Sequence, residues 1–206
     1  MSNAVQFKTP VGELQWIFIT GKGKKDLNGN DRFVASVVVD STSESGKAMI
    51  AQIDTYWEDN KPKGTKKCKS LGYKMLVDEN DEETGMVSFN FWTGITFPDG
   101  SAKVIKTFNA KGAEVSLGSK KIGNGSRGKV GGAMAVYDNG VAARGVTLYL
   151  NSIQLSKFVE FTGSDSYDEL EDEDGEGFTG VDDDGMEAMT ETEQSGSGET
   201  AAKPRL

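Results

Sequence analysis

Hydrophobic and polar residues alternate with a period of two along most of residues 1–163, which is typical of β-strands that bury one face. Val, Ile, Thr and aromatic residues are frequent in these runs, and clusters of Gly, Asn, Asp and Pro separate them. The runs predict strands at 12–20, 31–39, 86–97, 102–108, 131–137 and 146–161.

One segment, 43–60, follows a helical period instead. Its large apolar residues fall at i, i+4, i+7 and i+8, on one face of a helix: Met49, Ile53, Tyr56 and Trp57. Ser43 or Ser45 can accept a hydrogen bond from a backbone N–H of the first turn and so cap this helix. The pattern therefore predicts one helix inserted between strands.

Short strands and frequent glycines favour a small curved barrel over a flat sheet, because glycine permits the sharp bends of barrel corners. A barrel with one helix between its strands is compatible with an OB-fold. An SH3-like or lipocalin-like barrel would show the same alternation, so the pattern alone leaves the type of barrel open.

Charge divides the chain into two parts near Ser164. The whole chain of 206 residues has a net charge of -9, which argues against a polyanionic partner. Residues 1–163 contain 21 basic and 17 acidic residues, a net charge of +4, whereas residues 164–206 contain 15 acidic and 2 basic residues. The second segment has too few apolar residues to form a core. We therefore expect a mildly basic domain over 1–163 and a disordered acidic tail over 164–206.

Histidine is absent and cysteine occurs once, as Cys68. The lack of histidine removes the commonest general base and metal ligand, together with Ser-His and Cys-His nucleophile pairs. A single cysteine forms no internal disulfide, as expected in a reducing cytosol, and no apolar run is long enough for a membrane span or a secretory signal. We expect a protein that is not an enzyme and that uses no metal or cofactor.

A glycine-rich segment resembles part of a phosphate-binding P-loop. Gly123, Gly128 and Lys129 have the P-loop spacing, but Val130 stands where the metal-binding Ser or Thr belongs. The residues that follow alternate as a strand does, whereas a P-loop opens a helix. We therefore expect a basic turn that leads into a strand and whose lysines and arginine contact a sugar-phosphate chain: Lys120, Lys121, Arg127 and Lys129.

The densest positive segment is 61–74, which holds six lysines and no acidic residue. It is an electrostatic guide for a polyanion in one interpretation and a surface loop paired with the acidic run 78–83 in the other. The lysines of this basic loop that we assign to the guide are Lys61, Lys63, Lys66, Lys67 and Lys69.

Basic residues also alternate with aromatic residues along the predicted strands. Proteins that hold single strands without reading their sequence combine cations for the phosphates with aromatic faces for the bases. Phe89, Phe91 and Phe97 are expected in the barrel core. Trp92 has the opposite parity and should face outward, as the best candidate for stacking on a base, and Tyr137 at a strand end is the next.

Several short motifs follow one another in a specific order and spacing. The first half contains T-x-x-G-x-x-x-(aromatic) from Thr9, Asn-Asp-Arg-Phe at 30–33, Asn-Lys-Pro-Lys at 60–63, Gly-Tyr-Lys at 72–74 and the F-x-F strand. The second half, from Lys103 to Phe161, contains Ile-Gly-x-Gly-Ser-Arg, a strand ending in Tyr and Leu-x-Ser-Ile-x-Leu, and the acidic tail follows. Together they resemble the single-stranded DNA-binding proteins of short-tailed bacteriophages and their relatives.

This resemblance implies a mainly β fold, an OB-fold-like five-stranded barrel with one helix inserted between strands and a disordered acidic C-terminal tail. It also implies sequence-independent binding of single-stranded DNA in phage replication, recombination and repair. The DNA-facing residues that it suggests are Arg32, Lys103, Lys106, Lys120, Arg127, Lys129 and Tyr137, with Trp92 as a neighbour.

In this family the acidic tail competes with DNA for the basic groove and contacts replication partners, so a polymerase and a helicase/primase are the expected partners. A homodimer and a location in the cytoplasm of the infected bacterial host are also expected, with no membrane contact. The tail departs from the family because it ends in AAKPRL rather than in acids and an aromatic residue. The alternative is a protein-interaction module whose acidic tail binds basic partners.

Overall fold

Five strands close into a barrel in the computed structural model, which describes residues 4–65, 68–140, 143–161 and 163. These strands are β2 (Gly12–Phe18), β4 (Asp31–Asp40), β6 (Glu83–Gly94), β8 (Ser126–Asp138) and β9 (Arg144–Lys157). The barrel order is β8-β2-β4-β6-β9, and β9 closes it by pairing with β8. All neighbours are antiparallel except β6 and β9, which are parallel. This is the order of an OB-fold, so the predicted fold class is confirmed.

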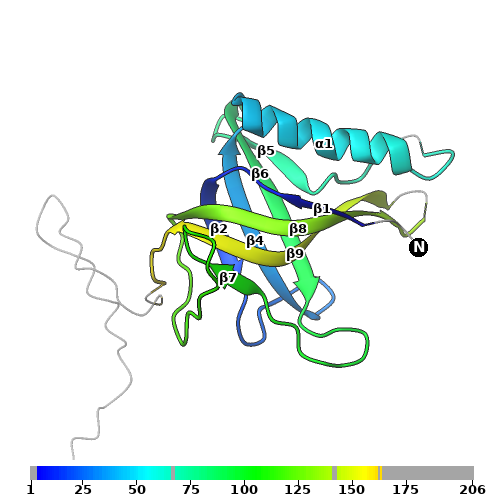
Figure 1. Ribbon diagram of the computed structural model, residues 1–206. Coiled ribbons are helices and arrows are strands. Elements are labelled where there is room, and N and C mark those ends of the chain that lie inside the picture. Colours follow the sequence, from blue (N-terminus) through cyan, green and yellow to red (C-terminus); the bar gives the residue numbers. More distant parts are fainter. Residues whose placement is uncertain (1–3, 66–67, 141–142, 162, 164–206) are drawn as a thin grey trace, which may run out of the picture. The chain divides into compact units, whose positions relative to one another are not determined.

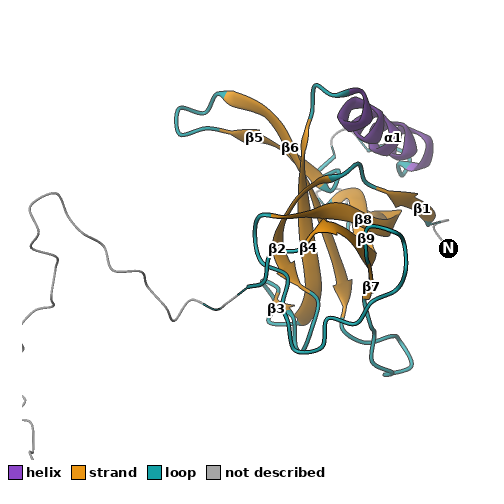
Figure 2. Cartoon of the chain, turned by 60° about the vertical axis from the view of Figure 1, so that its left-hand side comes forward, coloured by secondary structure: helices purple, strands orange, loops and turns teal. Residues whose placement is uncertain are grey.

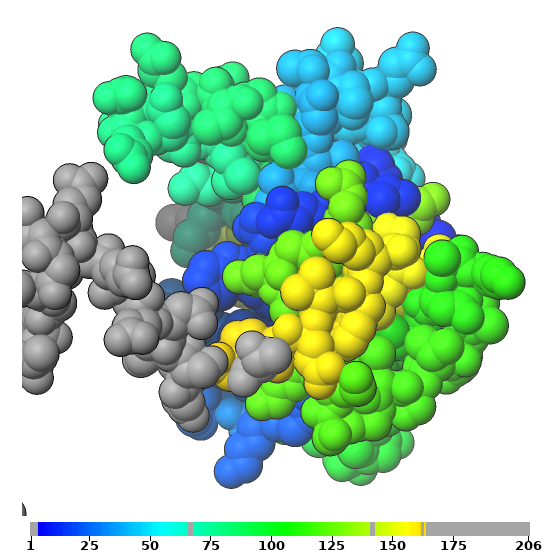
Figure 3. All heavy atoms as spheres, turned by 90° about the vertical axis from the view of Figure 1, so that its left-hand side faces the viewer, coloured from blue at the N-terminus to red at the C-terminus, as the bar shows by residue number. Residues whose placement is uncertain are grey.

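Four shorter strands extend this sheet beyond the barrel (Figure 1). They are β1 (Val5–Lys8) on β8, β3 (Lys24–Lys25) on β4, β5 (Tyr73–Val77) on β6, and β7 (Lys106–Phe108) on β9. The hairpin of β5 and β6 stands out from the barrel in the cartoon and in the space-filling view (Figures 2 and 3). Its tip is therefore remote from the barrel wall.

The barrel interior is filled by one face of each strand, as the alternation predicts. Phe89 and Phe91 on β6 are buried, and the ring of Phe91 stacks on that of Phe7 with centroids 5.7 Å apart. Strands β8 and β9 approach each other closely at Gly132, where an added Cβ would lie 2.2 Å from the carbonyl oxygen of Tyr149. Glycine is therefore required at this position.

Helix α1 (Glu44–Asn60) lies between β4 and β5 and buries the face that the sequence predicts. The buried large side chains are Met49, Ile53, Tyr56 and Trp57. Ser43 is the cap: its Oγ accepts a hydrogen bond from the N–H of Gly46 at 3.0 Å and donates one to the carbonyl of Asp40 at 2.7 Å. The choice between Ser43 and Ser45 is thereby settled.

Replacing Ser43 by alanine is expected to lower the free energy of unfolding by about 1 kcal/mol, because the Gly46 N–H loses its acceptor. Ser45→Ala is the matched control and should change stability much less, since the Ser45 hydroxyl is not the cap. Urea unfolding of both variants measures the difference. Equal losses in the two variants would contradict the assignment of the cap.

Three details differ from the sequence prediction. Phe97 is 46% exposed instead of buried, because β6 ends at Gly94 and Phe97 lies in the turn that follows. The expected strand at 102–108 is shortened to β7, while Val104 is largely exposed. Strands β1, β3 and β5 were not predicted, since runs of two to five residues give too little alternation to detect.

The acidic tail, 164–206, lies outside the described residues, so its disorder and the domain boundary at Gly163 stay predictions. Within the part of the chain that is described, no helix combines the length and the apolar character needed to cross a membrane.

Candidate nucleic-acid interface

A row of apolar and aromatic side chains crosses the outer face of four barrel strands. The strand register places Phe18 of β2 opposite Val34 of β4, Val34 opposite Trp92 of β6, and Trp92 opposite Tyr149 of β9. The rings of Trp92 and Tyr149 are in contact, with centroids 5.6 Å apart. Trp92 is 38% exposed and Phe18 is 40% exposed, so the row of Phe18, Val34, Trp92 and Tyr149 presents aromatic faces to solvent. We call these four residues the aromatic row.

Cations lie directly over the aromatic row. The guanidinium carbon of Arg32 is 4.9 Å from the centre of the Trp92 ring, and the Lys24 ammonium is 5.8 Å from that of Phe18. Both residues come from the hairpin of β3 and β4, where Lys24 stands opposite Arg32. The structure thus brings the predicted residues Arg32 and Trp92 together, and the outward orientation predicted for Trp92 is observed.

Asp26 fixes the position of Arg32. Its Oδ2 accepts a hydrogen bond from Arg32 Nε at 3.1 Å, while its Oδ1 accepts from the backbone N–H groups of Asn28 and Asn30, each at 2.9 Å. The Asn30 backbone bond is the largest cause that lowers the pKa of the Asp26 carboxyl, to about 2, and the Asn30 side chain, Arg32 and Asn28 contribute to the same shift. The carboxylate therefore stays charged in mild acid and holds the guanidinium beside Trp92.

The structure predicts a titration midpoint of about 2 for Asp26, against an ordinary value of 3.8. A carboxyl with a lowered pKa stabilises the fold above its unfolded pKa, and this contribution is lost as the pH falls toward 2. The protection factors of the Asn28 and Asn30 amides, taken against their intrinsic exchange rates at the same pH, should thus fall between pH 4 and pH 2, and Asp26→Asn should abolish that pH dependence. A carboxyl NMR titration with a midpoint near 3.8 would contradict the hydrogen-bonding scheme.

A groove of about 640 Å³ continues from Trp92 along β9. Tyr137, Tyr149 and Lys74 line it, so the predicted residues Trp92 and Tyr137 share one groove. Partial burial, followed by the nearby Cys68, raises the pKa of the Tyr137 phenol, which therefore stays protonated at neutral pH.

Two further polar side chains in this groove are held in place by neighbours. Asn90 Oδ1 accepts hydrogen bonds from the hydroxyls of Ser36 at 2.8 Å and Ser88 at 3.2 Å. The Tyr73 hydroxyl donates to Asp54 at 2.8 Å, and burial together with this bond raises the Tyr73 pKa. The groove walls are therefore fixed by internal hydrogen bonds before any ligand binds.

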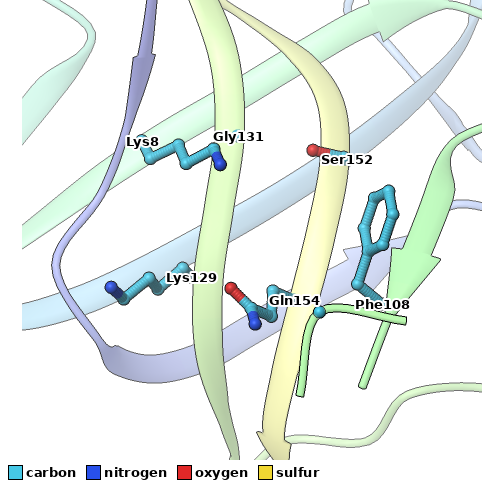
Figure 4. A pocket seen from close by; sticks show the side chains of 7 residues that line it. Lys8, Phe108, Lys129, Gly131, Ser152 and Gln154 are labelled. Carbon is cyan, nitrogen blue, oxygen red and sulfur yellow. The ribbon is translucent and has the colours of Figure 1, made fainter. Parts of the chain in front are cut away.

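Lys129 lies in a separate cleft of about 150 Å³ over β1, β8, β9 and β7 (Figure 4). Lys8 and Lys129 stand on one side of this cleft, the ring of Phe108 stands on the other, and Gln154 lies between them. Gly131 also lines the cleft, and a Cβ added there would lie 2.5 Å from the Ser152 hydroxyl oxygen. Cations and an aromatic ring thus face one small space.

The other predicted cations have partners within the described residues or stand apart. Lys106 pairs with Glu114 at 3.2 Å and Lys120 pairs with Glu160 at 2.9 Å. The Lys103 ammonium donates to the Thr93 hydroxyl at 2.7 Å and lies 4.9 Å from the centre of the Phe97 ring. Arg127 is exposed near the start of β8, opposite Lys157 of β9. The geometry therefore separates these residues from the aromatic row or gives their charges internal partners.

The basic loop is described in part, because Lys66 and Lys67 lie outside the described residues. Lys61 forms an ion pair with Glu58, and Lys63 is exposed. The backbone N–H of Lys69 donates to the carbonyl of Arg144 at 2.8 Å, which ties the end of the loop to β9 near the groove. Its role as a guide for a polyanion stays a prediction.

The segment that resembles a P-loop forms a turn and the start of β8. Lys129 is a strand residue, so no helix N-terminus is available there to hold a phosphate. The expectation of a basic turn leading into a strand is confirmed. Among the described residues, no cluster of acidic residues and cysteine is arranged to hold a metal ion.

Several residues of these sites were not singled out from the sequence. Tyr149 could have been found, because it has the opposite parity from the apolar residues Leu148 and Leu150 on the same strand. The others depend on strand pairing or on bends that the alternation does not reveal. They are Lys8, Phe18, Lys24, Asn90 and Gln154.

The closed barrel, the parallel pairing of β6 with β9 and the exposed aromatic row define an OB-fold with an open outer face. Solved structures with this fold include gp2.5, a single-stranded DNA-binding protein encoded by bacteriophage T7. It is 18% identical, with a TM-score of 0.55, and the match covers 79% of this chain and 91% of that chain.

A second similar structure is the single-stranded DNA-binding protein from bacteriophage Enc34, solved in complex with single-stranded DNA. It is 14% identical, with a TM-score of 0.55, and the match covers 79% of this chain and 95% of that chain. No protein-family model and no curated protein sequence matches the chain. The resemblance to phage single-stranded DNA-binding proteins is confirmed at the level of the fold.

Proposed function

We propose that this protein binds single-stranded DNA without sequence preference and acts by binding alone, without catalysis. The observation that carries the proposal is the aromatic row with Arg32 and Lys24 over its rings. Stacking on an aromatic ring accepts any base, and cations neutralise the phosphates between stacked bases. The outer face of the second and third barrel strands is also where OB-folds bind oligonucleotides.

The aromatic row binds unpaired bases by stacking. Trp92 and Tyr149 offer their rings to successive bases, and stacking contributes about 1–3 kcal/mol per base. Duplex DNA hides these base faces in its stack, so the protein should prefer single strands. Arg32 is positioned in advance by Asp26 and therefore loses little side-chain freedom on binding.

The cations around the barrel extend the contact with the phosphates. In the cleft, the backbones that carry Lys129 and Phe108 are two strand spacings apart, about 10 Å, so one nucleotide can span from the ammonium to the ring. Arg127 adds exposed charge on the same strand. Lys106 and Lys120 contribute only if a phosphate replaces the carboxylates of Glu114 and Glu160. We also propose that Lys103, whose ammonium lies beside Thr93 near the end of β6, contacts a phosphate.

A gel-shift competition between single-stranded and double-stranded DNA at two salt concentrations tests this function. The proposal requires a strong preference for the single strand and weaker binding at the higher salt, because neutralising each phosphate contributes about -0.7 to the slope of log affinity against log salt. Binding of basic proteins without any affinity for oligo-dT would support the protein-interaction module instead. Sequence independence requires oligo-dT and mixed-sequence strands to bind within a small factor of each other.

Within this proposal the protein acts in phage DNA replication, recombination and repair in the cytoplasm of the infected host. Its acidic tail, 164–206, competes with DNA for the cationic face and recruits a polymerase or a helicase/primase. Dimer formation stays a prediction.

Truncation after Gly163 removes 15 acidic residues and should raise the affinity for oligo-dT. If the truncated chain binds no more tightly in a fluorescence titration, the competing role of the tail is wrong.

A further inference from the structure

Two large aromatic side chains near the end of β2 are exposed beside a cation. Trp16 is 58% exposed and Phe18 is 40% exposed. The Lys24 ammonium lies 5.3 Å from the centre of the Trp16 ring and 5.8 Å from that of Phe18. The part of the structure described places no other ring against that of Trp16, so its indole is open to a ligand.

A bulge in β2 turns these rings outward. The pairing of β2 with β4 shifts register between Gln15 and Phe18. A regular strand would place Trp16 and Phe18 on the buried face of Leu14. The shift instead directs Ile17 and Ile19 toward the core and leaves both aromatic rings in solvent.

The outward orientation of the Trp16 ring comes with a strained backbone at this residue. Its φ is 54°, in the left-handed region that non-glycine residues rarely adopt. Its N–H donates to Oδ1 of Asn124, in the glycine-rich turn, at 3.2 Å. Glycine or asparagine would adopt this conformation at lower cost, so the indole is present despite the strain. Such strain is characteristic of functional sites.

We propose that Trp16, Phe18 and Lys24 form a second stacking subsite, which takes a nucleobase on the indole and the adjoining phosphate on the lysine. The occupant is the same single strand that lies on the aromatic row, because Phe18 belongs to both sites through its position opposite Val34. The inference therefore rests on the proposed function and extends the path of the strand across β2. The adjacent cation suits a nucleotide, which carries a base and a phosphate together.

Trp16→Asn tests the subsite, because asparagine tolerates the left-handed backbone and has no ring. The variant should unfold at the same or a higher urea concentration than the wild-type chain, and its affinity for a long oligo-dT should fall by roughly 5- to 150-fold. Val77→Asn is the matched control, since it removes an exposed apolar side chain toward the tip of the β5–β6 hairpin, outside the residues that line the groove, and should leave affinity unchanged.

Tryptophan emission gives a second measurement that uses the intact Trp16 ring. In a Trp92→Phe chain the remaining tryptophans are Trp16 and the buried Trp57, so quenching by oligo-dT reports on Trp16. Quenching together with the affinity loss of Trp16→Asn supports the subsite. Unchanged emission and unchanged affinity, in a wild-type protein that binds oligo-dT, overturn the subsite and leave the proposed function intact. A wild-type protein that binds no oligo-dT overturns both.

Discussion

Replacing Trp92 by alanine is expected to weaken binding of oligo-dT by about 1–3 kcal/mol, roughly 5- to 150-fold. The ring lies at the centre of the aromatic row, between Val34 and Tyr149, and the substitution also removes the surface over which Arg32 is held. Because Trp92 is 38% exposed, the free energy of unfolding should fall much less than for a core residue. A fluorescence titration with labelled oligo-dT measures the loss.

Trp92→Phe is the matched variant, since it keeps an aromatic face against Tyr149. It should retain most of the affinity that the alanine variant loses. If alanine at position 92 leaves the affinity for oligo-dT unchanged while the barrel stays folded, the row is not the binding surface.

The adjacent residue, Phe91, should show the opposite behaviour. Its ring is 2% exposed and stacks on Phe7, and Phe91→Ala is expected to lower the free energy of unfolding by about 3–5 kcal/mol. The loss combines the burial of the ring with the cavity left between β6 and β8, where the Phe91 ring lies close to Gly132. Urea unfolding monitored by circular dichroism measures it.

At urea concentrations where the Phe91→Ala chain remains folded, its affinity for oligo-dT should be close to that of the wild-type chain. Phe91 and Trp92 point to opposite faces of one strand, so each serves as a control for the other. A Phe91 variant as stable as the wild-type chain would contradict the core described here.

Much of the fold could be predicted because the barrel strands are long and bury one face. Strand β4 and the core positions Phe89 and Phe91 follow directly from the alternation, and helix α1 follows from its apolar spacing. The strands that were not predicted form because they pair with a longer neighbouring strand. Strand β3, for example, has two residues and pairs with β4. Phe97 was misplaced because the alternation continues past Gly94, where the strand ends.

The candidate site was predicted less completely, because it depends on which strands are neighbours. Arg32 and Trp92 are 60 positions apart in the sequence, and their contact comes from the pairing of β4 with β6. Acidic partners also could not be anticipated, so the ion pairs of Lys106 and Lys120 appear only in the structure. The exposure of Trp16 requires a bulge that the sequence pattern does not reveal.

Titration of a Trp16→Phe chain with oligo-dT, followed through tryptophan emission, tests the central claim most directly. Trp92 is then the exposed tryptophan, because Trp57 lies on the buried face of helix α1. Stacking of the strand on Trp92 predicts quenching that saturates as the strand binds and a midpoint that moves to higher DNA concentration as salt is added. Emission from Trp92 that stays unchanged up to saturating oligo-dT would contradict binding of single-stranded DNA on the aromatic row.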